Sequence, residues 1–200
     1  MIAIIDYGRG NLYSVQKAFA RLGAQAVVTS DAGQIAAADR VVLPGVGAFG
    51  DCMNNLRSYG LETVIRQVTD RGIPFLGICL GLQLLFDGSE EDPGVAGLGI
   101  IPGMVRKINT RGLKIPHMGW NSLAFGTASP LFSDLPDNPY VYFVHSYHAV
   151  PADEQLITAV TAYGEQVTAA IGRANIQAVQ FHPEKSSAVG MQMLKNWLSE

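Results

Sequence analysis

Short apolar runs alternate with amphipathic segments along the first part of the chain. Four apolar runs have the length and composition of buried strands, at residues 2–6, 26–29, 40–43 and 73–76. Helical spacing of apolar positions covers residues 14–22, where Gly23 closes the segment, and appears again between residues 51 and 70. Strands that alternate with helices predict a parallel sheet wound with helices, whose ligands bind beyond the carboxyl ends of the strands.

The pattern changes after residue 86, where Gly, Pro and Asn separate short β-prone runs. These runs predict antiparallel strands added to the sheet, at residues 104–107, 115–123, 140–150, 156–163 and 167–171. A closing helix over residues 187–198 should turn Val189, Met193 and Trp197 inward as a core stripe. The expected fold class is therefore α/β: a mostly parallel wound sheet with flanking helices and added antiparallel strands, in a single domain over residues 1–200.

A cysteine with glycine at both second neighbours follows the fourth apolar run, in the segment Gly77-Ile78-Cys79-Leu80-Gly81. Helix formers fill residues 80–86, so Cys79 lies where a strand turns into a helix, the arrangement of a nucleophile elbow. The glycines let the backbone turn without Cβ clashes, and the helix N-terminus at Leu80 favours thiolate over thiol. An arbitrary cysteine is more often a small core residue, and the flanking glycines argue against that interpretation here.

A base for this nucleophile is available far downstream, where the strand-like residues 178–181 run into His182-Pro183-Glu184. Pro183 disfavours a helical conformation at His182, so we expect an extended triplet in which His182 and Glu184 share a face. The imidazole could then accept the Cys79 proton while the carboxylate fixes its tautomer. Taken alone, His-Pro-Glu is more often an exposed pair at a strand end, and only its combination with the cysteine elbow in the same chain favours catalysis.

Glycines also follow the third apolar run, where Gly45, Gly47 and Gly50 match the G-x-G-x-x-G dinucleotide fingerprint. That interpretation requires an acidic residue at the tip of the next strand, and the next strand here ends at Cys79. A glycine-rich loop that can reorient could instead turn a backbone N–H toward the carbonyl that Cys79 attacks. Together with the N–H of Leu80, it would form an oxyanion hole.

Composition narrows the possible partners. The chain carries 14 basic and 17 acidic residues, a net charge of −3, and no Lys/Arg cluster, so we expect no nucleic-acid partner. No apolar run approaches the roughly 20 residues that span a bilayer, and no leader precedes the first strand, so we expect a cytoplasmic protein.

Two cysteines are too few for a secreted disulfide framework, and we expect Cys52 to be an inert helix residue. The four histidines lack metal-binding spacing, so neither a metal nor another cofactor is expected.

With these three segments in place, the whole chain resembles the class I, triad-type glutamine amidotransferases, whose glutaminase domains share the cysteine elbow, the glycine-rich oxyanion strand and the His-Pro-Glu triplet. Within that family, residues 6–12, 116–121 and 181–186 are similar to the glutaminase subunits of imidazole glycerol phosphate synthases. The run Pro-His-Met-Gly-Trp-Asn at 116–121 is the most specific part of this resemblance.

The resemblance implies roles for further residues. Gln83, one helical turn after Cys79, and Glu91, in an acidic turn that could equally be a solvated loop, would hold polar groups of the substrate. Backbone N–H groups near Ser146 and Tyr147 would receive its carboxylate, whereas a structural role is expected for His145. In all, the residues expected to bind substrate are Gly45, Val46, Gly47, Leu80, Gln83, Glu91, Ser146 and Tyr147.

The residues expected at the interface with a partner, or in allosteric control, are Asn11, His117, Met118, Trp120 and Lys185.

The resemblance also implies an activity and a partner. The activity is hydrolysis of L-glutamine to glutamate and ammonia by Cys79, His182 and Glu184. The ammonia would pass to a separate cyclase subunit, with which this chain would form a heterodimer that serves histidine biosynthesis. The cyclase of this family is a (β/α)₈ barrel, a fold of about 250 residues, and a chain of 200 residues has no room for a second domain of that size. Alternatives are a glutaminase subunit of anthranilate or pyridoxal phosphate synthase and a γ-glutamyl peptidase on the same fold. A papain-type peptidase would need another Cys context, and a non-enzymatic regulator would need a damaged triad.

Overall fold

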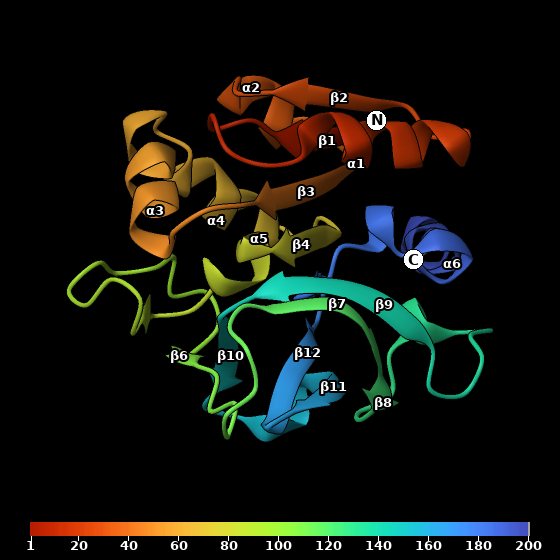
Figure 1. Cartoon of the computed structure of the whole chain (residues 1–200). Coiled ribbons are helices and arrows are strands. Elements are labelled where there is room, and N and C mark those ends of the chain that lie inside the picture. Colours follow the sequence, from red (N-terminus) through yellow and green to blue (C-terminus); the bar gives the residue numbers. More distant parts are fainter. Residues whose placement is uncertain (200) are drawn as a thin grey trace.

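A computed structural model describes residues 1–199 and places one eight-stranded sheet at the centre of the chain (Figure 1). In spatial order its strands are β2 Ala26–Thr29, β1 Ile2–Ile5, β3 Arg40–Gly45, β4 Phe75–Cys79, β13 Ile176–Val179, β12 Glu165–Arg173, β11 Ile157–Tyr163 and β8 Ala124–Phe125. The first five strands are mutually parallel, and the pairs from β13 to β8 are antiparallel. The predicted fold class is therefore confirmed, and β13 brings the C-terminal part of the chain beside β4.

Helices cover both faces of the parallel half of the sheet. They are α1 Leu12–Arg21, α2 Ala32–Ala36, α3 Phe49–Ser58, α4 Glu62–Asp70, the short α5 Leu80–Gln83 and α6 Ser187–Ser199. Successive residues of a strand point to opposite faces, so Ala3 and Ile5 pack with α2, α3 and α4, whereas Ile2 and Ile4 pack with α1 and α6. The result is a three-layer arrangement with an apolar core on each side of the sheet.

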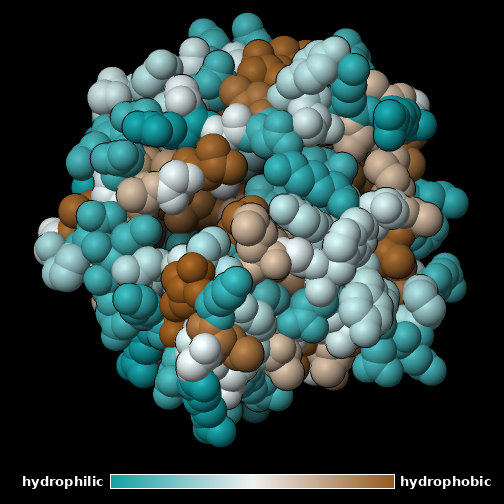
Figure 2. Space-filling model, viewed as in Figure 1, coloured by the Kyte–Doolittle hydropathy of each residue, from teal (hydrophilic) through white to brown (hydrophobic). Residues whose placement is uncertain are grey.

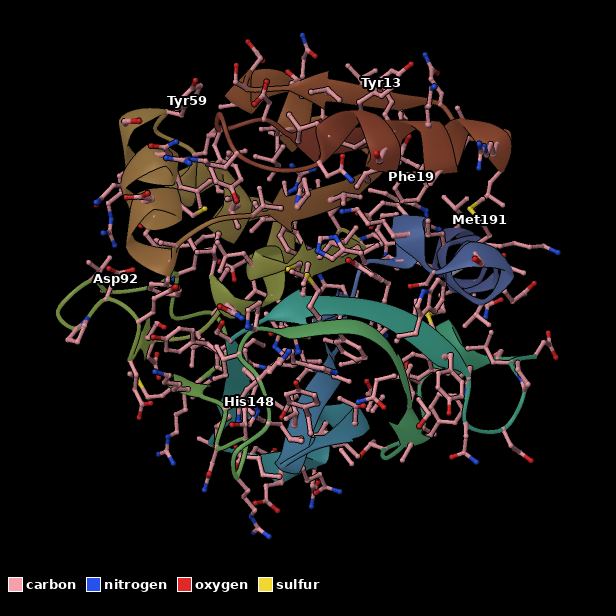
Figure 3. The ribbon with its side chains drawn as sticks, viewed as in Figure 1. Tyr13, Phe19, Tyr59, Asp92, His148 and Met191 are labelled. Atoms are coloured by element: carbon pink, nitrogen blue, oxygen red, sulfur yellow. The ribbon has the colours of Figure 1, made fainter. Side chains whose placement is uncertain are left out.

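The closing helix α6 joins the N-terminal layer to the C-terminal part of the chain. Met193 and Trp197 are buried as predicted and Val189 is partly buried, while Gly190 and Leu194 extend the stripe. Phe19 points from α1 toward α6 (Figure 3), and its ring centroid lies 5.6 Å from that of Trp197. This contact covers the face of the sheet occupied by Ile2 and Ile4.

Two small sheets stand beside the antiparallel half. One has the order β10 Tyr147–Pro151, β6 Gly103–Lys107 and β5 Gly88–Ser89, and the other pairs β7 His117–Ser122 with β9 Tyr140–His145. His148 on β10 connects the first small sheet to the central sheet (Figure 3), because its Nδ1 accepts a hydrogen bond from the Thr168 N–H of β12 at 3.2 Å. The remaining short elements are the 3₁₀ turns η1 Pro130–Phe132, η2 Glu154–Leu156 and η3 Pro183–Lys185.

Besides small shifts at the ends of elements, three sequence-based predictions differ from the structure. The helix expected over residues 80–86 ends at Gln83, because the carbonyls of Leu84 and Leu85 accept bonds from residues 98–101. The β-prone run 140–150 is two strands in different sheets, separated at Ser146. The prediction of an extended triplet at His182 was wrong, because only His182 is extended. Pro183, whose fixed φ suits a first helical position, begins η3.

The junction between β4 and α5 depends on close backbone packing against β3. The parallel register places Gly45 of β3 beside Cys79 of β4, and a Cβ on Gly45 would lie 2.9 Å from the Leu80 Cβ. A Cβ on Gly81 would overlap the carbonyl oxygen of Leu43. Glycine at these positions therefore permits close approach, whereas the turn itself is made by Cys79, the residue with positive φ.

The surface mixes polar residues with separate apolar patches on the face seen in Figure 1, as Figure 2 shows. Exposed large apolar side chains include Tyr13, Met118 and Trp120. Within residues 1–199, no helix combines the length and the hydrophobicity that crossing a bilayer requires.

Substitution of Gly81 tests the close packing at the junction. Alanine normally stabilises a helix by about 1 kcal/mol relative to glycine, but at Gly81 its Cβ would overlap Leu43. We expect Gly81→Ala to lower the free energy of unfolding by about 3 kcal/mol, as overpacked cores do, measured by urea denaturation. The matched control is Gly88→Ala, whose Cβ would meet only the flexible end of Met104 at 3.4 Å and the Val95 carbonyl at 3.6 Å. A stabilised Gly81→Ala protein would contradict the packing argument.

Candidate active site

Cys79 lies at the carboxyl end of β4 and immediately precedes α5. Its backbone is left-handed, with φ 56° and ψ −112°, a conformation that costs a residue with a Cβ about 1–3 kcal/mol. The surrounding structure maintains this strain through the packing of Gly45 and Gly81 against their neighbours. The thiol therefore stands at a sharp strand-to-helix turn, 7% exposed, with the N–H groups of α5 directly after it.

His182 and Glu184 form a buried pair at the end of β13. The His182 Nδ1 and the Glu184 Oε1 are 2.8 Å apart, with side chains 2% and 1% exposed. Burial alone would lower the pKa of His182, but the proximity of the Cys79 thiol and the Glu184 carboxylate outweighs it and raises that pKa to about 9. The ring's other nitrogen, Nε2, is buried without a hydrogen-bond partner among the described residues, which leaves it available for proton transfer.

A cavity of about 260 Å³ brings the elbow and the imidazole together. Both Cys79 and His182 contribute to its walls. Its walls also include seven of the eight residues expected to bind substrate: Val46, Gly47, Leu80, Gln83, Glu91, Ser146 and Tyr147. The eighth, Gly45, is buried against the Tyr7 hydroxyl and does not reach the walls. Because Cys79 and His182 are more than 100 positions apart, the sheet order that places β13 beside β4 is what assembles the site.

Gln83 is held firmly in the cavity wall. Its Nε2 donates to the Tyr147 carbonyl at 3.0 Å and to the Gln180 Oε1 at 2.9 Å. Both N–H bonds are thereby used, so the amide oxygen of Gln83 is the atom that can meet a ligand.

Glu91 belongs to a turn that caps a helix. Its Oε2 accepts from the Phe49 N–H at 2.9 Å, and the neighbouring Asp92 Oδ2 accepts from the Gly50 N–H at 2.7 Å, beside the N-terminus of α3 (Figure 3). Burial raises the pKa of Glu91, which the Phe49 N–H partly offsets. The turn is therefore more than a solvated loop, and Glu91 presents a carboxyl group to the cavity.

Two buried side chains hold the end of β3 and the glycine-rich segment that follows it. The Tyr7 hydroxyl donates to the Pro44 carbonyl at 2.9 Å, and the Cys52 thiol donates to the Val46 carbonyl at 3.4 Å. Cys52 is fully buried in α3, and burial raises the pKa of its thiol to about 11, so it stays protonated. Cys52 is thus an unreactive thiol, as expected, with a structural bond that the sequence did not indicate.

Two histidines form a hydrogen-bond chain that ends at the wall of the cavity. The Asn121 amide donates to the Ala162 carbonyl at 3.0 Å and to the His117 Nε2 at 3.2 Å, so His117 carries its proton on Nδ1. That Nδ1 lies 2.9 Å from the His145 Nε2, and the His145 Nδ1 lies 2.8 Å from the Tyr147 carbonyl. Burial lowers the pKa of His117 to about 4 and of His145 to about 3, so both rings are neutral. The chain ends on the same carbonyl that orients Gln83.

The residues expected at an interface lie close to the site. Met118 and Trp120, 64% and 52% exposed, project from β7, and the Trp120 ring is 6.2 Å from the Tyr142 ring. Lys185 Nζ lies 6.0 Å from the centroid of the same Tyr142 ring. Asn11, in the loop before α1, donates to the Glu184 Oε1 at 3.4 Å. His117, by contrast, is buried at 3% and stacked on Phe143 and Tyr163.

Sequence reasoning missed several residues of the site. Pro116 and Val144 line the cavity, as does His145, for which only a structural role was expected. The Nε2 of Gln180 lies 3.9 Å from the sulfur of the nucleophile. A signal for Gln180 was present, since it is a polar residue inside the apolar run before His182. Within residues 1–199, no three His, Cys, Asp or Glu side chains cluster in a way that would hold a metal ion.

Comparisons with known proteins agree with this geometry. The family model "Glutamine amidotransferase class-I" matches residues 3–200. The imidazole glycerol phosphate synthase subunit HisH of Moorella thermoacetica is 55% identical over 98% of this chain and 93% of its own length, and that of Thermosynechococcus vestitus is 53% identical over 99% and 96%.

Solved structures show the same fold at low sequence identity. A structure described as a glutamine amidotransferase superposes with a TM-score of 0.77 at 17% identity and covers 100% of this chain and 98% of its own. PurLQS from Thermotoga maritima gives a TM-score of 0.74 at 16% identity, with 99% and 97% covered. On the family match and the full-length identity, the chain belongs to the class I glutamine amidotransferase family and groups within it with the HisH subunits of imidazole glycerol phosphate synthase.

Proposed function

We propose that this chain hydrolyses the γ-amide of L-glutamine at Cys79 and passes the ammonia to a separate cyclase subunit. The observation that carries the proposal is the convergence of a strained elbow thiol and a buried His182–Glu184 pair, 2.8 Å apart, on one cavity of about 260 Å³. That volume lies just below the roughly 300–1,000 Å³ of pockets that bind drug-sized ligands, so it suits a smaller ligand. The full-length identity to HisH subunits favours this acceptor over anthranilate or pyridoxal phosphate synthases.

The residues define the proposed steps. The Cys79 thiolate attacks the γ-amide carbon of glutamine, and His182, which has taken the thiol proton, holds it on Nε2 next to the reacting atoms. N–H groups at Leu80 and in the segment 45–47 stabilise the oxyanion. The imidazolium then protonates the departing nitrogen, so ammonia leaves and a γ-glutamyl thioester remains. His182 next accepts a proton from the water that attacks the thioester, and glutamate is released as the thiolate re-forms.

The walls of the cavity can hold the rest of the substrate. Glu91 supplies a carboxylate for the α-ammonium group, and the amide oxygen of Gln83 supplies a second acceptor. Backbone N–H groups near Ser146 and Tyr147 receive the α-carboxylate. Glu184 stays bonded to the His182 Nδ1 throughout, where it fixes the tautomer and stabilises the imidazolium.

The proposed partner is a (β/α)₈-barrel cyclase in a cytoplasmic heterodimer. It would combine the ammonia with a phosphoribulosyl substrate to give imidazole glycerol phosphate and an aminoimidazole carboxamide ribotide in histidine biosynthesis. Exposed Met118 and Trp120 offer an apolar docking surface on β7. That surface continues through Tyr142 to Lys185, the residue after Glu184, so a bound partner would touch groups adjacent to the triad.

Replacing the nucleophile tests the chemistry. Cys79→Ala and Cys79→Ser should lower glutamine turnover in the cyclase complex by roughly 10⁴- to 10⁶-fold, because neither side chain can act as a thiolate at this turn. Cyclase activity with ammonium salts should survive in both variants. The control is Cys52→Ser, which keeps a donor for the Val46 carbonyl and should retain turnover. More than a few per cent of glutaminase activity in either Cys79 variant would refute the assignment.

A second experiment tests control by the partner. We infer that the isolated chain has a misaligned oxyanion hole, and that the partner and the cyclase ligand together rotate the backbone of segment 45–47, whose Gly47 has φ +105°. One oxyanion donor is worth about 10² to 10³ in rate, so glutamine turnover should rise by that factor from the chain alone to the liganded complex. Turnover is compared for the chain alone, with partner, and with partner plus ligand.

Variants of the interface positions extend that experiment. Asn11→Ala and Lys185→Ala should weaken activation by the cyclase ligand more than they weaken complex formation, because Asn11 contacts Glu184 and Lys185 follows it in the chain. Arg66→Ala, which removes an exposed cation on α4 at the other face of the sheet, is the matched control. Full turnover by the isolated chain would exclude the switch and leave the triad chemistry intact.

A further inference from the structure

Gln180 is a fully buried amide between the end of β13 and His182. It is 0% exposed, although glutamine is rarely found inside a protein. Its Nε2 lies 3.9 Å from the Cys79 Sγ, and its Oε1 lies 2.9 Å from the Gln83 Nε2. A buried polar side chain is stable only when its donors and acceptors are paired, and here the pairs are the nucleophile and a wall residue of the cavity.

The backbone determines which end of each amide faces which partner. A carbonyl can only accept, so the atom of Gln83 that faces the Tyr147 carbonyl at 3.0 Å must be its NH₂ group. That NH₂ group also faces Gln180, so the atom of Gln180 that it meets must be the oxygen. The remaining end of the Gln180 amide, which faces the Cys79 sulfur, is therefore the NH₂ group.

The Tyr147 carbonyl, on which this assignment of the amide atoms depends, is itself held by further hydrogen bonds. The Tyr147 carbonyl also accepts from the Nδ1 of His145, and the bond chain behind His145 runs in one direction from the Asn121 amide. A flip of either glutamine amide would set an oxygen against this carbonyl or leave a buried N–H without an acceptor, which costs about 1–3 kcal/mol. The N–H directed at Cys79 is thus set by the fold.

We propose that Gln180 is a positioning residue that donates an N–H to the Cys79 thiolate and, through its oxygen, holds Gln83 in the orientation that receives the substrate. This inference rests on the glutaminase chemistry proposed above and adds a thiolate donor that is independent of His182. A hydrogen bond to the charged form of a group favours that form. Loss of the donor therefore shifts the ionisation of the thiol to higher pH, and loss of the acceptor frees Gln83.

Two substitutions separate the two halves of the role. Gln180→Glu keeps an oxygen for the Gln83 N–H but replaces the NH₂ group that meets the sulfur. Gln180→Met has a similar length and removes both bonds. The matched control is Gln177→Met on β13, the strand that precedes Gln180. Gln177 is also buried, at 5% exposure, and its amide oxygen accepts from the Ser129 hydroxyl at 3.1 Å, away from the site.

The first readout is the rate at which iodoacetamide alkylates Cys79 as a function of pH, with the modified peptide identified by mass spectrometry. It is measured on the complex with the cyclase partner and requires no glutamine. We expect the midpoint of the rate profile to move up by about one pH unit in Gln180→Met, the size of one hydrogen bond to a charged group. The upward shift should be larger in Gln180→Glu, because its carboxylate adds a negative charge beside the sulfur. The Gln177→Met midpoint should equal that of the parent protein.

The second readout is the steady-state kinetics of glutamine hydrolysis by the same complexes. Gln180→Met should raise KM about tenfold and lower kcat, whereas Gln180→Glu should lower kcat with KM close to the parent value. A folded Gln180→Glu protein with the parental alkylation midpoint overturns the proposal, as does a parental midpoint and KM in Gln180→Met. If no variant, parent included, hydrolyses glutamine, the proposed function fails while the alkylation profiles still decide the role of Gln180.

Discussion

The left-handed backbone of Cys79 is the constraint on which the rest of the site depends. A residue with a Cβ adopts this conformation only when its surroundings compensate the strain, and here β3 supplies the compensation. Gly45 lies in register with Cys79, and Gly81 lies so close to the Leu43 carbonyl that no larger residue fits without movement. The strand pairing that builds the sheet therefore also points the thiol into the cavity and places the N–H groups of α5 behind it.

The polar groups around this turn form one hydrogen-bond network centred on the Tyr147 carbonyl. Neutral His117 and His145 donate toward that carbonyl from β7. From the other side, Gln83 donates both to the same carbonyl and to Gln180, which in turn donates to the nucleophile. Burial keeps both rings neutral, since it lowers their pKa values to about 4 and 3. Because each donor in this network has an acceptor, the side chains of Gln83 and Gln180 are held in place before substrate arrives. The same network links the exposed surface of β7 to the cavity.

Much of the fold and the chemistry could be predicted from local sequence. The parallel strands follow from short apolar runs, and Cys79 follows from glycines two residues away on each side. His182 and Glu184 were found because both flank one proline, although the turn they occupy was predicted as extended. Features that depend on distant contacts were not predictable, since no local pattern encodes them. Examples are the end of α5 at Gln83, set by pairing with residues 98–101, and the contact of Gln180 with a sulfur 101 positions away.

The account requires a covalent γ-glutamyl thioester on one particular sulfur, and trapping it is the most direct measurement. The complex with the cyclase partner and its ligand is quenched with acid during glutamine turnover, digested, and examined by mass spectrometry. The predicted result is a γ-glutamyl adduct on the peptide that contains Cys79, with the Cys52 peptide unmodified. An adduct on another residue, or turnover that continues after Cys79 has been fully alkylated, would contradict it.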